Sequence, residues 1–392
     1  MAAQLIPLSP VIRDRLSPNA FVVDRALALA AAPQARGAAP LSLDPESTAW
    51  ALALGATYIG LFWCARATFA HGGVRTTIRR VAMLGLGLTT LVAVQRATSP
   101  TLLYWLWQPL SAGASPYGPF VNRNGLAGWL AMAVPLALGY ALARGASRPP
   151  VFGGLAARIA ALDATQLLLG GAACLMVGGL LGSLSRGGIF GGAAGLMLFV
   201  VLAQSRTTGG RAMAGVAALV AAMVAIGAMY ANLGALAMRM RETTELGEWG
   251  RRAIWHDTIV MIRDFPFAGV GAGAFQRGML VYQEGSRQFF FNHAHNEYLQ
   301  IAAEGGLLIA LPAAFAAIAA TVAIVRRLRA DHTAMFWIRA GAIAGIVAVA
   351  VQSLFDTGLR TPANGVLFAI VAAIAVHERE SNRRDRGERR ER

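Results

Sequence analysis

The chain has 392 residues, of which 56% are hydrophobic and only 14% are charged, and its mean hydropathy is +0.51. Soluble proteins carry about 25% charged residues, so this composition excludes an ordinary soluble domain and predicts a protein that crosses a membrane several times. The basic residues behind the formal net charge of +15 are all arginine, because the chain contains no lysine. Most of these arginines lie in short loops and at the C-terminus, where membrane topology accounts for them without a nucleic acid partner.

The chain begins with a segment, residues 1–47, that has no basic stretch followed by an apolar one and therefore no signal peptide. The topology derived below places this segment outside the cytoplasm, which is unusual without a signal. We therefore expect that relatives carry further membrane spans upstream, and that this chain lacks them through a truncated or misassigned start. An apolar coding stretch in frame before Met1 would support this hypothesis, and a native N-terminus mapped to Met1 would contradict it.

Nine segments are long and apolar enough to cross a bilayer as helices. They cover residues 48–65, 81–97, 125–143, 165–183, 188–204, 212–231, 299–325, 335–355 and 361–377. We predict an all-α, polytopic membrane bundle of about nine transmembrane helices, six within residues 48–231 and three within residues 299–377. Residues 232–298 then form one large loop between them, and residues 378–392 form a basic tail.

Arginines are concentrated in every second connection between these segments. The arginine-rich set lies within residues 66–80, 144–158, 206–211, 326–329 and 379–392. By the positive-inside rule these connections and the tail are cytoplasmic. The opposite set, residues 98–124, 184–187, 232–298 and 356–360, is then extracytoplasmic, together with residues 1–47.

Few polar groups fall inside the predicted spans. Cys64 and Cys174 lie within apolar stretches and are expected to be buried apolar residues, which makes a disulfide framework improbable. Glu304 is the one acid placed to join a relay through the membrane, whereas ion-coupled transporters carry a trail of such acids. The pattern therefore disfavours a transporter.

A tight extracytoplasmic turn, Gly-Ser-Leu-Ser-Arg-Gly-Gly at residues 182–188, carries Arg186 beside Ser185. Glycines on either side let the backbone turn sharply and approach a ligand closely. An arginine that merely snorkels to lipid phosphates is the alternative, but snorkelling does not require a glycine-rich turn. We interpret Arg186 as a binding residue for an anionic group.

The large loop is predicted to contain an amphipathic helix that begins near Glu248 and ends at Pro266, with Trp255, Ile259 and Ile262 on its apolar face. Arg251 and Arg252, at its N-terminal end, combine guanidinium groups with free helix N–H donors, which suits a phosphate. A passive helix at the membrane surface is the alternative. The following glycine run, residues 269–273, follows no strand, so it is not a nucleotide-binding fingerprint.

The segment His-Ala-His-Asn-Glu-Tyr-Leu-Gln, residues 293–300, places two imidazoles where the large loop enters an apolar span. Imidazole titrates near neutral pH, so His295, with His293 in support, is suited to proton transfer at a membrane surface. Asn296 is predicted to cap the helix that follows. The absence of a zincin-like acid spacing and of extracytoplasmic cysteines disfavours a metal site, and two polar residues at a helix start remain the structural alternative.

In their order and topological side, these motifs resemble the O-antigen ligase and polymerase superfamily, bacterial membrane glycosyltransferases of the GT-C type. The resemblance runs from about residue 118 to residue 370. It rests on Gly-Pro-Phe-Val-Asn-Arg-Asn at 118–124, Ser-x-Ser-Arg-Gly at 183–187, Arg-x-x-x-Trp at 251–255 with Pro-Phe-Ala-Gly-Val-Gly after it, and His-x-His-Asn-x-x-Leu-Gln at 293–300. Two departures are the smaller number of N-terminal spans and Gln352, where close relatives are expected to have histidine.

The resemblance implies transfer of a glycan from a polyprenyl-pyrophosphate donor to an acceptor hydroxyl at the periplasmic face of the inner membrane, with no cofactor and no metal. His295, Arg251 and Arg186 would be catalytic. The substrate-binding residues would be Arg252, His293, Asn296, Ser185, Arg123 and Asn124. The acceptor would be lipid A–core, another glycan or a protein hydroxyl, and membrane lipid would surround the site.

Two other functions stay open from the sequence. A polytopic transporter or lipid flippase would move its substrate without covalent transfer and would tolerate changes at His295. An inactive, truncated relative would agree with the smaller number of N-terminal spans.

Overall fold

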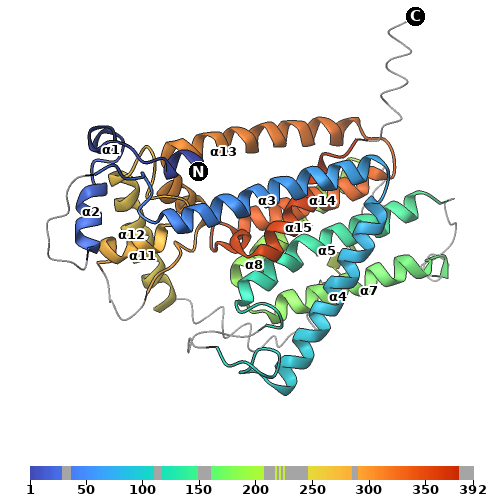
Figure 1. The fold of residues 1–392 in the computed structure, drawn as a ribbon. Helices are drawn as coiled ribbons and strands as arrows, with labels where there is room; N and C mark the ends of the chain where they lie inside the picture. Colours follow the sequence, from blue (N-terminus) through green and yellow to red (C-terminus); the bar gives the residue numbers. More distant parts are fainter. Residues whose placement is uncertain are drawn as a thin grey trace, which may run out of the picture. The chain divides into compact units, whose positions relative to one another are not determined.

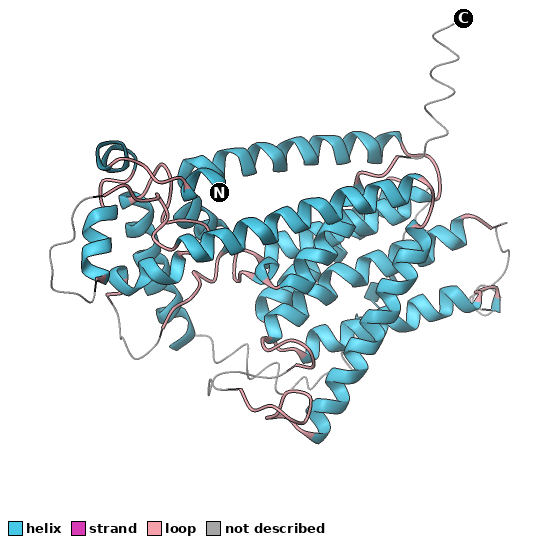
Figure 2. Ribbon diagram, in the orientation of Figure 1, coloured by secondary structure: helices cyan, strands magenta, loops and turns pink. Residues whose placement is uncertain are grey.

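The computed structural model describes residues 1–28, 37–109, 117–148, 160–206, 246–284 and 290–378, together with a few residues between 217 and 225. Every regular element in these ranges is a helix, and Figure 2 shows helices joined by loops without a strand in the described parts. The predicted all-α class is confirmed.

Seven of the described helices are long and apolar enough to cross a membrane. They are α3 (Pro45–Ala70), α4 (Val74–Thr98), α5 (Arg123–Ala146), α7 (Ala164–Gly182), α8 (Arg186–Gln204), α13 (Glu297–Ala330) and α14 (Met335–Gln352). The apolar helix α15 (Pro362–Ala375) is shorter. Eight of the nine predicted spans thus correspond to a helix, and the chain is a multi-pass membrane protein. The span predicted at residues 212–231 lies mostly outside the described residues, as does the basic tail.

The fold consists of two compact units that interleave along the chain. The loop unit comprises Met1–Ile59, Arg241–Thr321 and Ser353–Thr357. The helix unit comprises Gly60–Met240, Val322–Gln352 and Gly358–Arg392. Helices α3 and α13 each contribute to both units.

In the helix unit, α5 is the most buried helix, and it packs against α14, α7, α8, α4 and α15 (Figure 1). Small residues allow this close packing. A Cβ built at Gly139 would lie 2.3 Å from the carbonyl oxygen of Trp337, and one at Gly341 would lie 2.3 Å from that of Pro135. Transmembrane helices associate through such small-residue contacts, because lipid chains give apolar side chains no reason to prefer protein.

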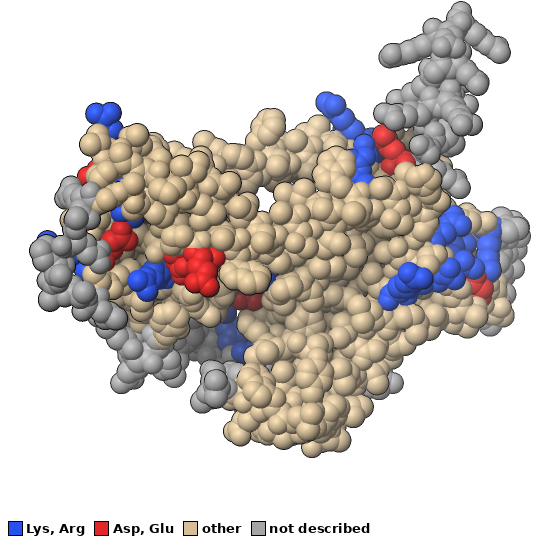
Figure 3. Space-filling view, in the orientation of Figure 1, with Lys and Arg blue, Asp and Glu red and all other residues tan. Residues whose placement is uncertain are grey.

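One set of charged groups in the helix unit is paired between the end of α5 and the start of α7. Asp163 caps α7, accepting the Gln166 N–H at 2.6 Å, and forms ion pairs with Arg144 and Arg148. The bond to Arg144 and the one from Gln166 hold the pKa of the Asp163 carboxyl below its usual range. Figure 3 shows blue side chains gathered where α5 ends and α7 begins, which agrees with a predicted basic connection at residues 144–158, although residues 149–159 lie outside the described ranges.

The loop unit contains α1 (Pro10–Leu16), α2 (Ala20–Leu27), α11 (Leu246–Asp264), α12 (Phe275–Tyr282) and the first part of α13. The predicted amphipathic helix is present as α11, but its apolar face is rotated from the predicted one. Ile254, Met261 and Phe265 are buried, whereas Ile259 is exposed. The difference arises because α11 packs into a core with α2 and α12. These tertiary contacts, and not the spacing of apolar residues along the helix, decide which side is buried.

The glycine run after α11 interlocks with α13, which is broken at Gly306 (φ 51°, ψ −155°). The Leu307 and Leu308 N–H groups, which have no partner within a broken helix, donate to the carbonyls of Pro266 and Phe267 at 2.9 Å. A Cβ at Gly269 (φ +64°) would lie 2.3 Å from the backbone of α13. The run is therefore a packing element, which agrees with the rejection of a nucleotide-binding loop.

The N-terminal segment completes this junction through Gln4, which is fully buried. Its side-chain amide donates to the carbonyls of Ala268 and Glu304 at 2.6 and 2.8 Å and accepts the Ala272 N–H at 3.2 Å. The described residues before α3, 1–28 and 37–44, are therefore part of the loop unit and not a separate tail.

Candidate functional site

The His-x-His-Asn motif ends at the first turn of α13, where Asn296 acts as the predicted N-cap. Its Oδ1 accepts the N–H groups of Tyr298 and Leu299 at 3.0 and 3.1 Å. His295, just before the cap, has a φ of 51°. Residues other than glycine seldom adopt this left-handed conformation, and it persists only where the surroundings impose it. The backbone of His295 is therefore held in place by its neighbours.

His295 faces a carboxylate, Asp356, in the connection at residues 356–360 that was predicted to be extracytoplasmic. Its Nδ1 lies 3.5 Å from Oδ1 of Asp356, whose side chain is 8% exposed, compared with 35% for His295. The carboxylate therefore lies where it would face the imidazolium formed if His295 accepted a proton. The two residues lie 61 positions apart in the sequence, so only the fold reveals the pair.

Two further side chains hold the motif's backbone. Ala294, fully buried, donates its N–H to Oε1 of Gln300 at 2.6 Å and accepts the Trp255 indole N–H at 2.9 Å. Gln300 in turn donates to Oε1 of buried Glu304 at 2.9 Å. Glu304, considered above for a proton relay, therefore supports the motif through Gln300. Trp255 and Gln300 position the backbone of the motif, a role that their sequence motifs alone did not predict.

Arg251 and Arg252 lie on α11, one turn before Trp255; Arg251 is half-buried and Arg252 exposed. One detail of the prediction is wrong. Helix α11 begins at Leu246, so the free N–H groups of its first turn precede both arginines. Phosphate binding here would depend on the guanidinium groups alone. His293, two residues before His295, is half-buried.

The remaining predicted residues lie in the helix unit, at the starts of α5 and α8. Arg123 and Arg186 are the first residues of these helices. Ser185 caps α8 by accepting the Gly188 N–H at 3.2 Å, and its hydroxyl donates to Oδ1 of Asn124 at 2.7 Å. The structure thus brings Ser185 and Asn124 into contact and joins two helix N-termini.

Two arginines at two neighbouring helix N-termini form an electrostatic arrangement that favours an anion. The N-terminal end of a helix carries a partial positive charge, and an arginine there adds to it. Exposed N–H groups and guanidinium groups together suit phosphate. The predicted glycine-rich turn is present, and Leu184 within it has a left-handed φ of 55°.

Buried amides support the start of α5. Gln352, at the position where histidine was expected, donates from Nε2 to the carbonyl of Asn124 at 2.8 Å. Asn364, which sequence analysis did not identify, donates to the carbonyls of Gly125 and Gly358 at 3.0 and 2.9 Å. Its position two residues after Pro362 at a helix start was the one available signal.

The predicted site residues therefore form two groups. His293, His295, Asn296, Arg251 and Arg252 belong to the loop unit, and Arg123, Asn124, Ser185 and Arg186 belong to the helix unit.

Comparison with protein families finds a match over residues 171–314 to a family model described as O-antigen ligase. The matched segment extends from α7 into α13, and contains all the predicted site residues except Arg123 and Asn124. No curated protein matches the chain. Residues 171–314 therefore match an O-antigen ligase domain, which supports the predicted resemblance of this multi-pass membrane protein to the O-antigen ligase-like superfamily.

Proposed function

We propose that the protein is an inverting glycosyltransferase that moves a glycan from a polyprenyl-pyrophosphate donor to an acceptor hydroxyl. The match of residues 171–314 to a family model described as O-antigen ligase supports the reaction class. The observation that carries the proposal is the His295–Asp356 pair, held in a constrained backbone at the start of a membrane helix. A base in that position meets a substrate whose lipid part lies in the membrane.

In the proposed step, the acceptor oxygen forms a bond to the anomeric carbon as the bond from that carbon to the pyrophosphate oxygen breaks. Attack from the side opposite the leaving group inverts the anomeric centre. Nε2 of His295 takes the hydroxyl proton, and Asp356 stabilises the imidazolium that forms. Positioned general bases of this kind accelerate reactions about 10²- to 10⁴-fold.

The leaving polyprenyl pyrophosphate gains negative charge as the bond breaks, and arginine is the suitable residue to stabilise it. We assign Arg251 and Arg186 to this role, with Arg252, Arg123 and Asn124 in substrate binding and Ser185 fixing the turn. His293 and Asn296 support His295. The donor already contains the energy of the transferred bond, so the step requires no nucleotide, and the proposal routes no chemistry through a metal.

The active face is proposed to be periplasmic, in the bacterial inner membrane. In the helix unit, α7 joins α8 at the turn that carries Arg186, whereas the ion-paired arginines Arg144 and Arg148 lie by the opposite end of α7, at its capping residue Asp163. The positive-inside rule assigns the latter end to the cytoplasm. The Arg186 end then faces the periplasm, where lipid A–core, a glycan repeat or a protein hydroxyl would be the acceptor.

The test is transfer in vitro with purified protein, a polyprenyl-pyrophosphate oligosaccharide and each acceptor class in turn, without nucleotide. We expect sugar on one acceptor, and loss of transfer in His295→Gln and Arg251→Ala. His71→Gln, an exposed histidine of the helix unit, is the matched control and should transfer normally.

Full transfer by His295→Gln would refute the proposed base. Movement of the lipid-linked glycan across vesicles without covalent transfer would instead establish a flippase, and absence of both activities in folded protein would establish an inactive relative.

A further inference from the structure

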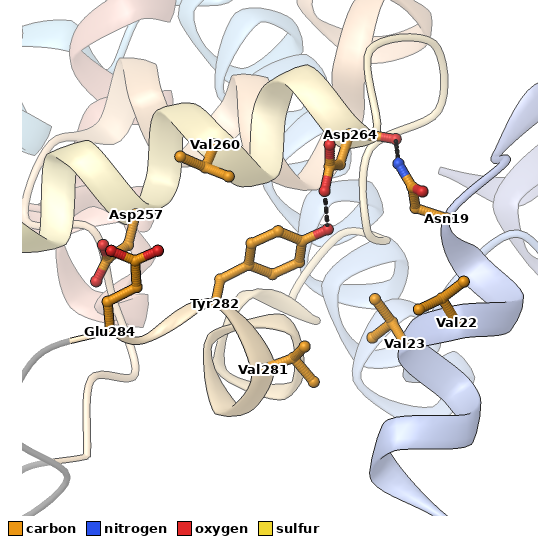
Figure 4. Close-up of a pocket in the computed structure, with 9 residues that line it drawn as sticks. All are labelled: Asn19, Val22, Val23, Asp257, Val260, Asp264, Val281, Tyr282 and Glu284. Atoms are coloured by element: carbon orange, nitrogen blue, oxygen red, sulfur yellow. Dashed lines mark hydrogen bonds between the residues drawn. The ribbon is translucent and has the colours of Figure 1, made fainter.

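Outside the proposed transfer site, the loop unit contains a cluster of three side chains with metal-binding groups. His256 and Asp257 are adjacent on α11, and Glu284 follows α12. One ligand atom from each lies within 4.8 Å of the other two. Figure 4 shows the carboxylates of Asp257 and Glu284 next to each other at one end of a cavity.

Asp257 is the informative member, because it is 4% exposed and therefore almost removed from water. Among the described residues its carboxylate has one polar contact, with Nδ1 of His256 at 3.5 Å, inside the cluster itself. Asp264, in the same cavity, differs in accepting the hydroxyl of Tyr282 at 2.6 Å (Figure 4). A buried carboxylate without a strong partner is costly, and a second carboxylate beside it adds repulsion. The arrangement calls for a cation.

We infer that His256, Asp257 and Glu284 bind a divalent transition-metal ion of the zinc class. Calcium and magnesium prefer sites made wholly of oxygen, whereas an imidazole with two carboxylates suits zinc. Ligands about 2.1 Å from a tetrahedral zinc ion lie about 3.4 Å apart. The exposed side chains of His256 and Glu284 can rotate by the small amount needed to reach that spacing.

The cavity beside the cluster provides room for the remaining coordination position. It has a volume of about 300 Å³ and is lined by Asp257, Glu284, Asp264, Tyr282 and apolar side chains. A water molecule bound to the ion there would complete four-coordination. Asn19, from α2, lines the same cavity and donates to the Asp264 carbonyl at 3.3 Å.

The ion would act as a cross-link between α11 and the segment after α12. Helix α11 carries Arg251 and Trp255, and the chain continues from Glu284 toward His293. Metal binding would therefore fix two segments that lead to the proposed transfer residues without contacting substrate. The inference does not depend on the glycosyltransferase proposal, since no step of transfer passes through the ion.

The test uses the full chain in detergent micelles, purified without a histidine tag, stripped with chelator and exchanged into metal-free buffer. Calorimetric titration with Zn²⁺ should show one saturable site per chain, and saturation should raise the midpoint of thermal unfolding. Glu284→Gln and His256→Gln each remove a ligand at an exposed position, so they should fold normally, lose the site and keep the metal-free midpoint of the wild type. His71→Gln should bind as the wild type does.

Three results would overturn the inference. The first is no saturable Zn²⁺ binding by folded wild-type protein. The second is equal binding by Glu284→Gln or His256→Gln. The third is a site that binds Ca²⁺ in preference to Zn²⁺, since this would contradict the donor chemistry.

Discussion

Replacement of Asp356 by asparagine removes the charge beside His295 while keeping the shape of the side chain. Two unit charges 4 Å apart attract by about 1 kcal/mol in water and about 4 kcal/mol at the effective dielectric constant near a protein surface. The observed separation is 3.5 Å, with Asp356 almost buried and His295 about one-third exposed. Solvent screening on the exposed side places the pair between these limits, at about 1 to 3 kcal/mol.

If that energy stabilises the imidazolium formed during transfer, Asp356→Asn should lower the rate of the chemical step between about fivefold and about 150-fold. The donor KM should change little, because the carboxylate acts through His295 and not on the pyrophosphate. The assay is single-turnover transfer from a labelled lipid-linked oligosaccharide at saturating acceptor, with thermal unfolding as a check on folding.

Asp24→Asn is the matched control, because Asp24 is also an ion-paired carboxylate of the loop unit, 2.7 Å from Arg13. It should leave the transfer rate unchanged. A rate for Asp356→Asn equal to that of the wild type would refute the role given to the pair. A fall in rate accompanied by an equal fall in stability would show that Asp356 is structural.

Three further predictions concern stability and are checked by thermal or chemical unfolding in micelles. Gly269→Ala should lower the free energy of unfolding by more than the cost of a left-handed backbone alone, which is about 1–2 kcal/mol, because its Cβ would meet the backbone of α13. Gly170→Ala is the control: its Cβ would enter open space, so the substitution should be neutral or slightly stabilising. Ser185→Ala removes the cap of α8 and should cost about 1 kcal/mol, and an unchanged midpoint would contradict the capping geometry. Burial, with the bond to Asp264, raises the pKa of the Tyr282 phenol, so the neutral form is favoured in the folded state. The contribution of Tyr282 to the stability of the fold is therefore complete below the ordinary phenol pKa of about 10 and is lost as the pH rises above it. Tyr282→Phe should abolish this pH-dependent loss of stability.

Much of the fold follows from sequence because the membrane imposes long apolar helices. The predicted span at residues 125–143, for example, corresponds to α5. The capping role of Asn296 was also predictable, since it depends on neighbours two and three residues away. Local chemistry of this kind does not need knowledge of the tertiary structure.

Features that depend on distant contacts were not predictable. The buried face of α11 follows from packing against other helices, so Ile254 and not Ile259 points inward. Asp356 becomes the partner of His295 only when the segment after α14 joins the loop unit. Cys64, expected to be buried, is exposed because composition distinguishes a membrane helix from a soluble one but does not indicate which of its sides meets protein.

The break in α13 at Gly306 has a consequence for how the chain folds. The carbonyls of Ala303 and Glu304 accept N–H groups from Val270 and Gly271, so helix and glycine run complete each other's hydrogen bonding. Neither can be satisfied alone in hydrocarbon, where every backbone polar group requires a partner. The N-terminal part of α13 therefore reaches its final form only together with the glycine run. Folding of the glycine run and formation of the break in α13 are therefore one coupled step.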